Sequence, residues 1–353
     1  MSNLAASNSK KPRPSSSFLS LPGDVALNCL ARVPRCYDLN VSCVSKPLRS
    51  LVRSGEINRL RSQLLPKTSV YLSFYFRYRF RPRSPTHWLT FRPGETETTD
   101  YMPLEDVPIH SSPVSVGSEI YFIGRCNDNL WILDTRSRNL RTAPGMNVSR
   151  SMREAAVGVV DGKIYVIGGS EEESQVEVFD PQTQTWEFAG EEKVQCKSRF
   201  SASLEQKVYI VGSDHVSAYC PSEGIISNEA AMENLSAKCL CVVENVIYAC
   251  KGSELMWFNT KLKVWRRVVD RDGKDGKLEM YSSVAEKMVE YEGKLAFLWP
   301  LRSNIGPMKD DIVCKLIALD RVGDEVRGTV EWSGIVATLP LPITLEDSLV
   351  VSD

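Results

Sequence analysis

Three histidines and ten cysteines are the side chains of this 353-residue chain that most often bind metals or act as nucleophiles. His87, His110 and His215 do not recur at metal-ligand spacing, and no two cysteines have the Cys-x-x-Cys spacing of a zinc site. The glycine-rich phosphate-binding loops, the His-Glu-x-x-His motif and the Gly-x-Ser-x-Gly elbow are also missing from the sequence. We therefore predict a protein that is not an enzyme and that has no catalytic residue, no metal and no cofactor.

Charged and protruding segments offer binding chemistry instead. Residues 69–83 alternate aromatic side chains with arginines, which is the periodicity of a strand with its arginines on one face. An acidic run lies between two predicted strands near residue 172, and a proline-containing insertion spans residues 303–311. Loops often carry binding, so the candidate contacts for a partner are Arg77, Arg79, Glu171, Glu172, Glu173, Pro307 and Met308. The alternative is that these side chains are solvated surface without a partner.

The charge is divided between two parts of the chain. Up to Pro66 there are 10 basic and 3 acidic residues, a balance of +7, and the remainder has 33 basic and 41 acidic residues, a balance of −8. A mildly acidic larger part does not favour nucleic-acid binding. No apolar run is long enough to cross a bilayer, and the N-terminus lacks the apolar segment of a secretory signal. We expect a cytoplasmic or nuclear protein that binds neither nucleic acid nor membrane.

A repeated unit organises most of the chain. In its clearest copy Asp161-Gly162 predicts a type I′ hairpin turn, followed by a strand, Gly168-Gly169, a second strand and Trp186. Spacings of 44, 44, 39 and 49 residues separate the equivalent aromatic positions Tyr121, Tyr165, Tyr209, Tyr248 and Phe297. Units of four short strands every ~40–50 residues are typical of β-propeller blades. An all-β sandwich with coincidental spacing is the alternative.

The order of strand, glycine doublet, apolar-Asp pair and late tryptophan resembles kelch repeats, and the Trp-Asp dipeptide of WD40 repeats does not occur. The late tryptophan recurs at Trp265, is replaced by Leu140 and Ile226 in two copies, and corresponds after an insertion to Trp332 in the last copy. The resemblance implies a mainly β protein with a kelch-type propeller. Kelch propellers include copper- and iron-dependent proteins, and spacing alone leaves a carboxylate-rich iron site open.

The first blade lacks one strand, and the C-terminal Leu349-Val350-Val351 is a spare strand. Their pairing would close the ring and remove two open edges, which gives six blades, with five or seven as alternatives. We expect the propeller over residues 64–353, with blades near 69–105 plus 346–352, 110–147, 154–193, 199–235, 238–270 and 284–338.

The N-terminal part has a different pattern. Residues 1–17 are rich in Ser, Asn, Lys and Pro, which predicts a disordered tail. Residues 18–63 predict three short amphipathic helices, beginning near Pro22, at Leu39 and at Pro47, while Glu56 to Leu65 continues as a charged, helical linker. So small a module has too little core of its own and commonly completes it against a partner.

The segment from Leu21-Pro22 to Leu51 resembles an F-box, the helical motif that docks on the Skp-type adaptor of SCF (Skp–cullin–F-box) ubiquitin ligases. Gly23 replaces a common acidic residue, and Pro47 interrupts the usual spacing after Lys46. The resemblance implies that the adaptor interface is made or supported by Leu21, Pro22, Val25, Leu30, Pro34, Val44, Lys46 and Leu48. A helical hairpin that caps the propeller is the alternative.

An F-box followed by kelch repeats looks like the plant F-box/kelch-repeat family. The resemblance implies a substrate receptor whose F-box joins a cullin-RING ligase through the Skp-type adaptor and whose propeller holds an unknown target for ubiquitination. The alternative is a scaffolding propeller that has no association with a ligase.

Overall fold

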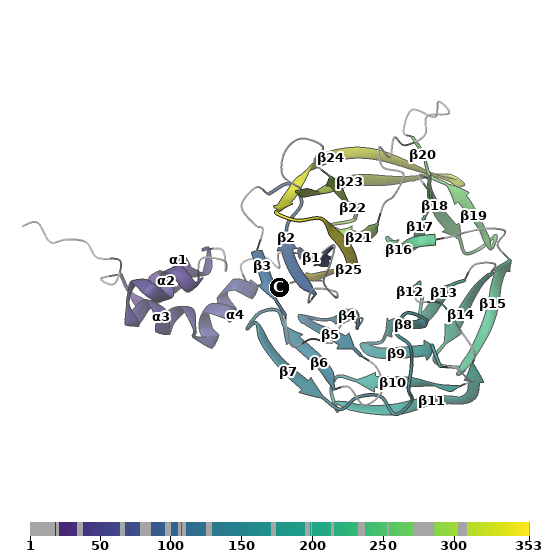
Figure 1. Ribbon diagram of the computed structural model, residues 1–353, viewed down its shortest axis with the longest axis horizontal. Helices are drawn as coiled ribbons and strands as arrows, with labels where there is room; N and C mark the ends of the chain where they lie inside the picture. The colour runs from purple at the N-terminus through teal and green to yellow at the C-terminus, as the bar shows by residue number, and fades with distance from the viewer. Residues whose placement is uncertain are drawn as a thin grey trace, which may run out of the picture. The chain divides into compact units, whose positions relative to one another are not determined.

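The structure is a computed structural model that describes residues 18, 21–33, 38–63, 68–77, 86–95, 100–104, 107, 111–124, 129–170, 174–194, 198, 200–212, 215–231, 237–252, 254–270, 278, 286–302 and 309–352. The chain divides into two compact units, Met1–Pro66 and Lys67–Asp353. The first is helical and the second is built from strands (Figure 1). The tail at residues 1–17 that we expect to be disordered lies outside the described residues.

The first unit contains four helices: α1 Gly23–Ala31, α2 Asp38–Val44, α3 Lys46–Val52 and α4 Gly55–Gln63. Pro22 stands immediately before α1, where its missing N–H leaves no helical hydrogen bond unmade. Ser45 caps α3, because the backbone N–H of Leu48 donates to its Oγ at 3.3 Å. One apolar cluster fills the unit and consists of Leu27, Leu30, Ala31, Leu48, Val52 and Ile57.

The interpretation of Glu56 to Leu65 as a linker is wrong for its first two turns. The stretch forms α4, and Ile57 is fully buried among the apolar side chains of α1 and α3. Leu60 of the same helix, which is partly buried, also packs against this cluster. The helix predicted for this stretch is therefore present, but it belongs to the module, whose described part has four helices.

The second unit is a ring of six antiparallel sheets, which confirms the six-blade propeller (Figure 1). Blade 1 contains β1 Thr68–Phe76, β2 His87–Phe91, β3 Asp100–Pro103 and β25 Ile343–Ser352. Blade 2 contains β4 Ser112–Val116, β5 Glu119–Ile123, β6 Leu130–Asp134 and β7 Asn139–Ala143. Blade 3 contains β8 Ala155–Val160, β9 Lys163–Gly168, β10 Ser174–Asp180 and β11 Thr185–Val194.

The remaining blades follow the same order. Blade 4 contains β12 Ser201–Leu204, β13 Lys207–Val211, β14 His215–Cys220 and β15 Ile225–Ala231. Blade 5 contains β16 Ala237–Val243, β17 Val246–Lys251, β18 Glu254–Asn259 and β19 Val264–Arg267. Blade 6 contains β21 Lys287–Tyr291, β22 Lys294–Arg302, β23 Asp310–Val322 and β24 Glu325–Leu339, with β20 Val269–Asp270 added in parallel to β24.

The ring closes as the sequence predicts, because the C-terminal strand β25 pairs antiparallel with β1 from Thr68↔Ser352 to Phe76↔Ile343. The core of the propeller lies between the blades. Each pair of neighbouring blades encloses its own apolar cluster, so six clusters hold the ring. Blade 1 packs against both of its neighbours through these clusters. Burial of apolar side chains therefore stabilises the closed ring in addition to the pairing of β25 with β1.

The repeated motifs have local physical roles. Asp161 and Gly162 have φ of 51° and 75°, which is the conformation of a type I′ turn. Gly169 has φ of 73°, and a Cβ there would lie 2.7–2.9 Å from Ala155, so the second glycine of the doublet lets two strands approach closely. The recurring Asp is a turn cap: Asp180 Oδ1 accepts from the N–H of Gln182 at 2.8 Å. Its equivalents are Asp134 and Asn259.

Trp332 does not occupy the late-tryptophan position, which corrects the prediction from the repeat. In blade 3 Trp186 pairs with Phe179, which itself pairs with Ile164. The corresponding chain of pairs in blade 6 runs from Leu295 through Ile317 to Val330. The same register places Ala296 at the position of Tyr165, so the predicted equivalence of Phe297 is wrong by one residue. Trp332 instead pairs with Leu316 after a bulge, because β23 and β24 are longer than other outer strands and shift the pattern along the chain.

Candidate protein-binding surfaces

Apolar side chains lie on the outside of the helical unit. Leu21 and Val25, at the beginning of α1, are each 39% exposed, and Val44, the last residue of α2, is 72% exposed. The unit already fills its own core with the opposite face of α1. Exposed apolar side chains beside a filled core indicate a docking surface rather than an incomplete fold. We name Leu21, Val25 and Val44 the apolar face of the module.

The other residues expected at the adaptor interface divide into two groups. Leu30 and Leu48 belong to the buried cluster, so they can support an interface but do not offer contact area. Pro22 and Lys46 are exposed at the beginnings of α1 and α3. Pro34 lies outside the described residues. Pro47 falls in the first turn of α3, where proline is accepted, so this departure from the usual spacing does not break the helix.

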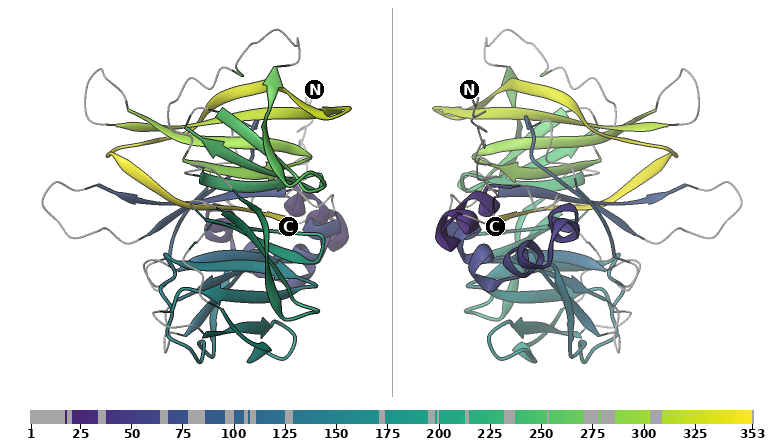
Figure 2. Two further views of the ribbon diagram at one scale, coloured as in Figure 1. Left: turned by 90° about the vertical axis from the view of Figure 1, so that its right-hand side faces the viewer. Right: turned by 90° about the vertical axis from the view of Figure 1, so that its left-hand side faces the viewer.

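The two ends of the propeller differ. The innermost strands β4, β8, β12, β16, β21 and β25 line the centre of the ring (Figure 1). All of these strands except the C-terminal β25 end in connections of two residues, such as Asp161-Gly162, that lead to the second strand of the blade, at what we name the turn end. The connections that enter the innermost strands lie at the opposite loop end. The connections from the second strand to the third lie there too, and most of them are longer than two residues, with β17–β18 as the exception. Figure 2 shows the strands running between these two ends.

The candidate contact segments of the propeller all start from the loop end, because each joins the second and third strands of a blade. Arg77 follows β1, is exposed, and donates its backbone N–H to the carbonyl of Pro342 at 2.8 Å. Arg79, Glu171, Glu172, Glu173, Pro307 and Met308 lie outside the described residues, in the connections β1–β2, β9–β10 and β22–β23. Their contact with a partner stays a prediction.

A pocket of about 260 Å³ opens at the loop end. It lies among the starts of innermost strands, with residues 344–347 of β25 on one side, Lys287 of β21 on another, and Ser112 of β4 with Arg153, which precedes β8, opposite. Glu346 and Asp347 contribute the acidic part of this lining. Sequence patterns did not single out this pocket, because its residues come from segments that are distant in the chain.

A buried ion pair holds the connection that leads to this pocket. Arg150 Nε lies 3.3 Å from Glu177 Oε2, and both side chains are fully buried. Arg150 also donates to the carbonyls of Gly168, at 2.7 Å, and Gln175. Glu177 accepts from the N–H groups of Asn147 and Val148 at 2.6 and 3.2 Å. Burial lowers the pKa of Arg150, and the Glu177 carboxylate opposes that shift.

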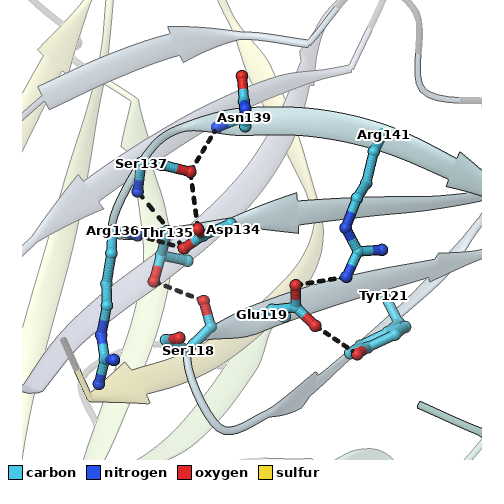
Figure 3. A network of polar contacts seen from close by, with 9 residues as sticks. All are labelled: Ser118, Glu119, Tyr121, Asp134, Thr135, Arg136, Ser137, Asn139 and Arg141. Atoms are coloured by element: carbon cyan, nitrogen blue, oxygen red, sulfur yellow. Dashed lines mark hydrogen bonds and ion pairs between the residues drawn. The ribbon is translucent and has the colours of Figure 1, made fainter. Parts of the chain in front are cut away.

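Polar contacts at the turn end are structural. In blade 2 the Glu119 carboxylate accepts from Arg141 at 2.5 Å and from the Tyr121 hydroxyl at 2.6 Å (Figure 3). Burial, and then Glu119, raises the pKa of Tyr121, so this hydroxyl stays protonated. Thr135 and Asp134 close the neighbouring turn (Figure 3). The network braces two hairpins and presents no activated nucleophile or base.

Among the described cysteines, Cys29 and Cys43 are exposed on the helical unit, Cys220 is partly buried in the propeller, and Cys239, Cys241, Cys250 and Cys314 are buried there. Burial raises the pKa of Cys241 and Cys314, which keeps them as unreactive thiols. Among the described residues no three His, Cys, Asp or Glu side chains gather as metal ligands would. None of the helices in the described ranges has the length and apolar character needed to cross a membrane.

The fold defines a two-part protein, with a small helical module followed in the chain by a six-bladed propeller. Comparison with known families agrees with both parts. Residues 18–60 match the F-box domain, and residues 94–337 match the domain described as FKB95, Kelch-repeats domain. The chain belongs to the F-box/kelch-repeat family.

Relatives from Arabidopsis thaliana are similar over nearly the whole chain. The F-box/kelch-repeat protein At2g41360 is 41% identical over 96% of this chain and 98% of its own length. The F-box/kelch-repeat protein At2g44630 is 37% identical over the full length of both. Among solved structures, a chain of the nidogen/laminin complex is similar with a TM-score of 0.49 and 7% identity, over 81% of this chain and 98% of that chain, and does not bear on function.

Proposed function

We propose that this protein is a substrate receptor of an SCF-type ubiquitin ligase, in which the helical module binds the Skp-type adaptor and the propeller binds a target. The observation that carries the proposal is the apolar face of Leu21, Val25 and Val44 on a module that already has a filled core and matches the F-box domain. A partner that covers this face removes apolar area from water, which favours association.

The receptor acts without chemistry of its own. Binding a target on the same chain as the adaptor raises the effective concentration of the target's lysines near the ubiquitin-loaded enzyme. The buried thiols and the protonated Tyr121 fit a binding role, because neither supplies a reactive group. Buried free cysteines also fit a reducing compartment, the cytoplasm or nucleus.

Target binding is assigned to the loop end of the propeller. Connections at the turn end are mostly of two or four residues, with the longer β2–β3 connection as the exception, whereas the loop end has most of the longer connections and the pocket. Binding proteins commonly place the residues that recognise a partner in variable connections on a rigid scaffold. The expected contacts Arg77, Arg79, Glu171, Glu172, Glu173, Pro307 and Met308 belong to segments that leave this end.

Capture of purified Skp-type adaptor by the full-length chain tests the first half of the proposal. We expect the wild type to retain the adaptor and the Leu21→Ala, Pro22→Ala double variant to lose it while keeping its thermal unfolding profile. The matched control is Leu262→Ala, which removes a 53%-exposed leucine from the propeller and leaves the apolar face of the module intact. If an adaptor preparation that binds another F-box protein is not captured by the wild type, the receptor proposal fails and a scaffolding propeller remains.

A further inference from the structure

We propose that the loop-end pocket binds a target segment in which a basic and an acidic side chain lie close together, and that Ser73 positions the carboxylates that recognise the basic one. This inference rests on the proposed function, since it describes how the propeller holds its target. It concerns the lining made by Arg153, Lys287, Glu346 and Asp347.

The size of the pocket favours side chains over a free small molecule. Its volume of about 260 Å³ is below the ~300–1,000 Å³ that small-molecule sites usually occupy. It opens at the loop end, the same end of the propeller to which the proposed function assigns target binding, so a peptide can cross the mouth while side chains enter. The occupant is therefore a segment of a protein, anchored by a few of its residues.

A β-bulge places both acidic residues in one wall of the pocket. Leu72 pairs with Ser348 and Phe74 pairs with Leu345, so the single residue Ser73 stands opposite both Glu346 and Asp347. In a regular strand consecutive side chains point to opposite faces. The bulge breaks this alternation at Glu346 and Asp347, which line the pocket together with their neighbours Thr344 and Leu345. Bulges commonly re-aim side chains beside functional sites.

Ser73 holds the bulge with its side chain. Its hydroxyl donates to the carbonyl of Asp347 at 3.3 Å and accepts from the N–H of Asp347 at 2.9 Å. Ser73 is 1% exposed, so water could not easily take the place of its hydroxyl. Without the hydroxyl, these backbone groups of Asp347 would lack a hydrogen-bond partner. A buried serine with two bonds to the bulged backbone thus sets the position of the acidic wall.

The basic side chains are held by separate contacts. Lys287 Nζ donates to the carbonyl of Glu346, which keeps its charge beside the acidic wall. Arg153 follows Arg150 in the connection that the buried Arg150–Glu177 pair anchors. That connection is also held by the N–H of Ser151, which donates to Gly169 at 2.6 Å. Lys287 is therefore tied to the acidic wall, while exposed Arg153 belongs to a connection whose backbone is held by buried contacts.

This arrangement selects for a ligand of mixed charge. The lining has two cationic and two anionic side chains, so a segment of one sign meets repulsion as well as attraction. A segment that carries one charge of each sign can place its basic side chain at Asp347 and Glu346 and its acidic one toward Arg153. One oxygen of the Glu346 carboxylate also accepts from the Thr86 hydroxyl at 2.9 Å. Complementary charges of this kind set register and suppress wrong partners.

A phage-displayed library of random twelve-residue peptides, selected on the immobilised full-length protein, tests the proposal. We expect the enriched peptides to combine Lys or Arg with Asp or Glu within a few positions. The Asp347→Asn variant should weaken their binding about tenfold, the effect of one charge-assisted hydrogen bond, and remove the preference for the basic residue. The Arg153→Gln variant should remove the preference for the acidic residue and keep the preference for the basic one.

The Ser73→Ala variant tests positioning, with Ser69→Ala as its control. Both serines are buried on β1, but Ser69 pairs regularly with Val351, outside the bulge. We expect Ser73→Ala, and not Ser69→Ala, to reduce the preference for the basic residue while the preference for the acidic residue remains. A merely structural role would weaken both preferences equally, and that result overturns the assignment of Ser73.

Two further outcomes overturn the pocket itself: enriched peptides of a single charge sign or of none, and a selection that enriches no sequence. Peptides that bind the wild type and the pocket variants equally well would place target binding elsewhere on the propeller, which leaves the proposed function intact. Adaptor capture is measured independently, so its failure would reject the ligase assignment without changing the peptide result.

Discussion

The Arg150 guanidinium and the Glu177 carboxylate lie 3.3 Å apart inside the propeller, with neither side chain exposed. The two residues are 27 positions apart, one in the connection before β8 and one in the middle of β10. The pair joins the connection between blades 2 and 3 to the body of blade 3, and the same connection continues to Arg153 at the loop-end pocket. A buried ion pair therefore supports both the fold and the wall of a candidate binding site.

Replacing Glu177 by Ala should lower the free energy of unfolding by about 3–5 kcal/mol, because Arg150 would be left as a buried charge without its counter-ion. Urea denaturation monitored by tryptophan fluorescence measures the change. Lys163→Met is the matched control: the Lys163–Asp180 pair lies at the surface, and its loss should change stability far less than loss of the buried pair. Equal effects of the two substitutions would contradict the role given to the buried pair.

Asp310 should matter for closure of the ring. This buried carboxylate accepts the backbone N–H of Ile343, the first residue of β25, at 2.9 Å. In Asp310→Ala that N–H loses its partner, and we expect a loss of about 1–3 kcal/mol with faster amide hydrogen exchange in β25 than in β8. The adjacent Asp311→Ala removes a surface contact with Thr338 and should change stability by less than about 1 kcal/mol. Uniform acceleration of exchange in all blades would argue against a local role at the closure.

Substitutions of Leu30 and Val44 should distinguish the stability of the helical module from its binding to the adaptor. Leu30→Ala empties part of the module's core and should cost about 2–5 kcal/mol of its stability. Val44 is 72% exposed, so Val44→Asp should keep the helical circular dichroism and thermal midpoint while abolishing adaptor capture. Full adaptor binding by Val44→Asp would show that α2 ends outside the interface.

Alkaline pH should destabilise the propeller through buried tyrosines. Burial raises the pKa of Tyr219 and of Tyr291 from 10.0 to about 12. The contribution of the two tyrosines to stability is therefore complete below pH 10, where each is protonated in both the folded and the unfolded chain. It is lost as the pH rises from 10 to 12, because the unfolded chain releases protons that the folded chain retains. Each tyrosine adds a slope of up to about 1.4 kcal/mol per pH unit in this window.

Urea denaturation of wild type and Tyr219→Phe at pH 8, 10 and 11 measures this effect. The variant loses the bond from the tyrosine hydroxyl to the carbonyl of Ala189, 3.1 Å long, so it should be slightly less stable at pH 8. Its stability should then fall less steeply above pH 10 than that of the wild type. Parallel curves for the two proteins would mean that Tyr219 ionises as easily in the folded state as in the unfolded one.

Short-range patterns in the sequence were enough to predict the architecture. The Asp161-Gly162 turn and the glycine doublet at Gly168 act within one blade and predict its strand order. The regular spacing of Tyr121, Tyr165 and Tyr209 repeats this unit along the chain and predicts the number of blades. The pairing of β25 with β1 was also predictable, because a spare strand and an open edge have few other partners. Trp332 was misassigned because a longer hairpin shifts the pattern in blade 6. The stretch that forms α4 was correctly predicted to be helical but was interpreted as a linker, because its charge obscured the docking of Ile57 and Leu60.

The sequence by itself determined the repeat, the turns and the amphipathic helices, because hydrogen bonding and side-chain alternation within a few residues leave a period that can be read along the chain. Only the tertiary structure decided that Glu177 meets Arg150, that Ser73 stands opposite a bulge, and that Arg153, Lys287 and Asp347 line one pocket. Those relationships join segments up to 274 residues apart, and burial between blades, not local preference, brings them together.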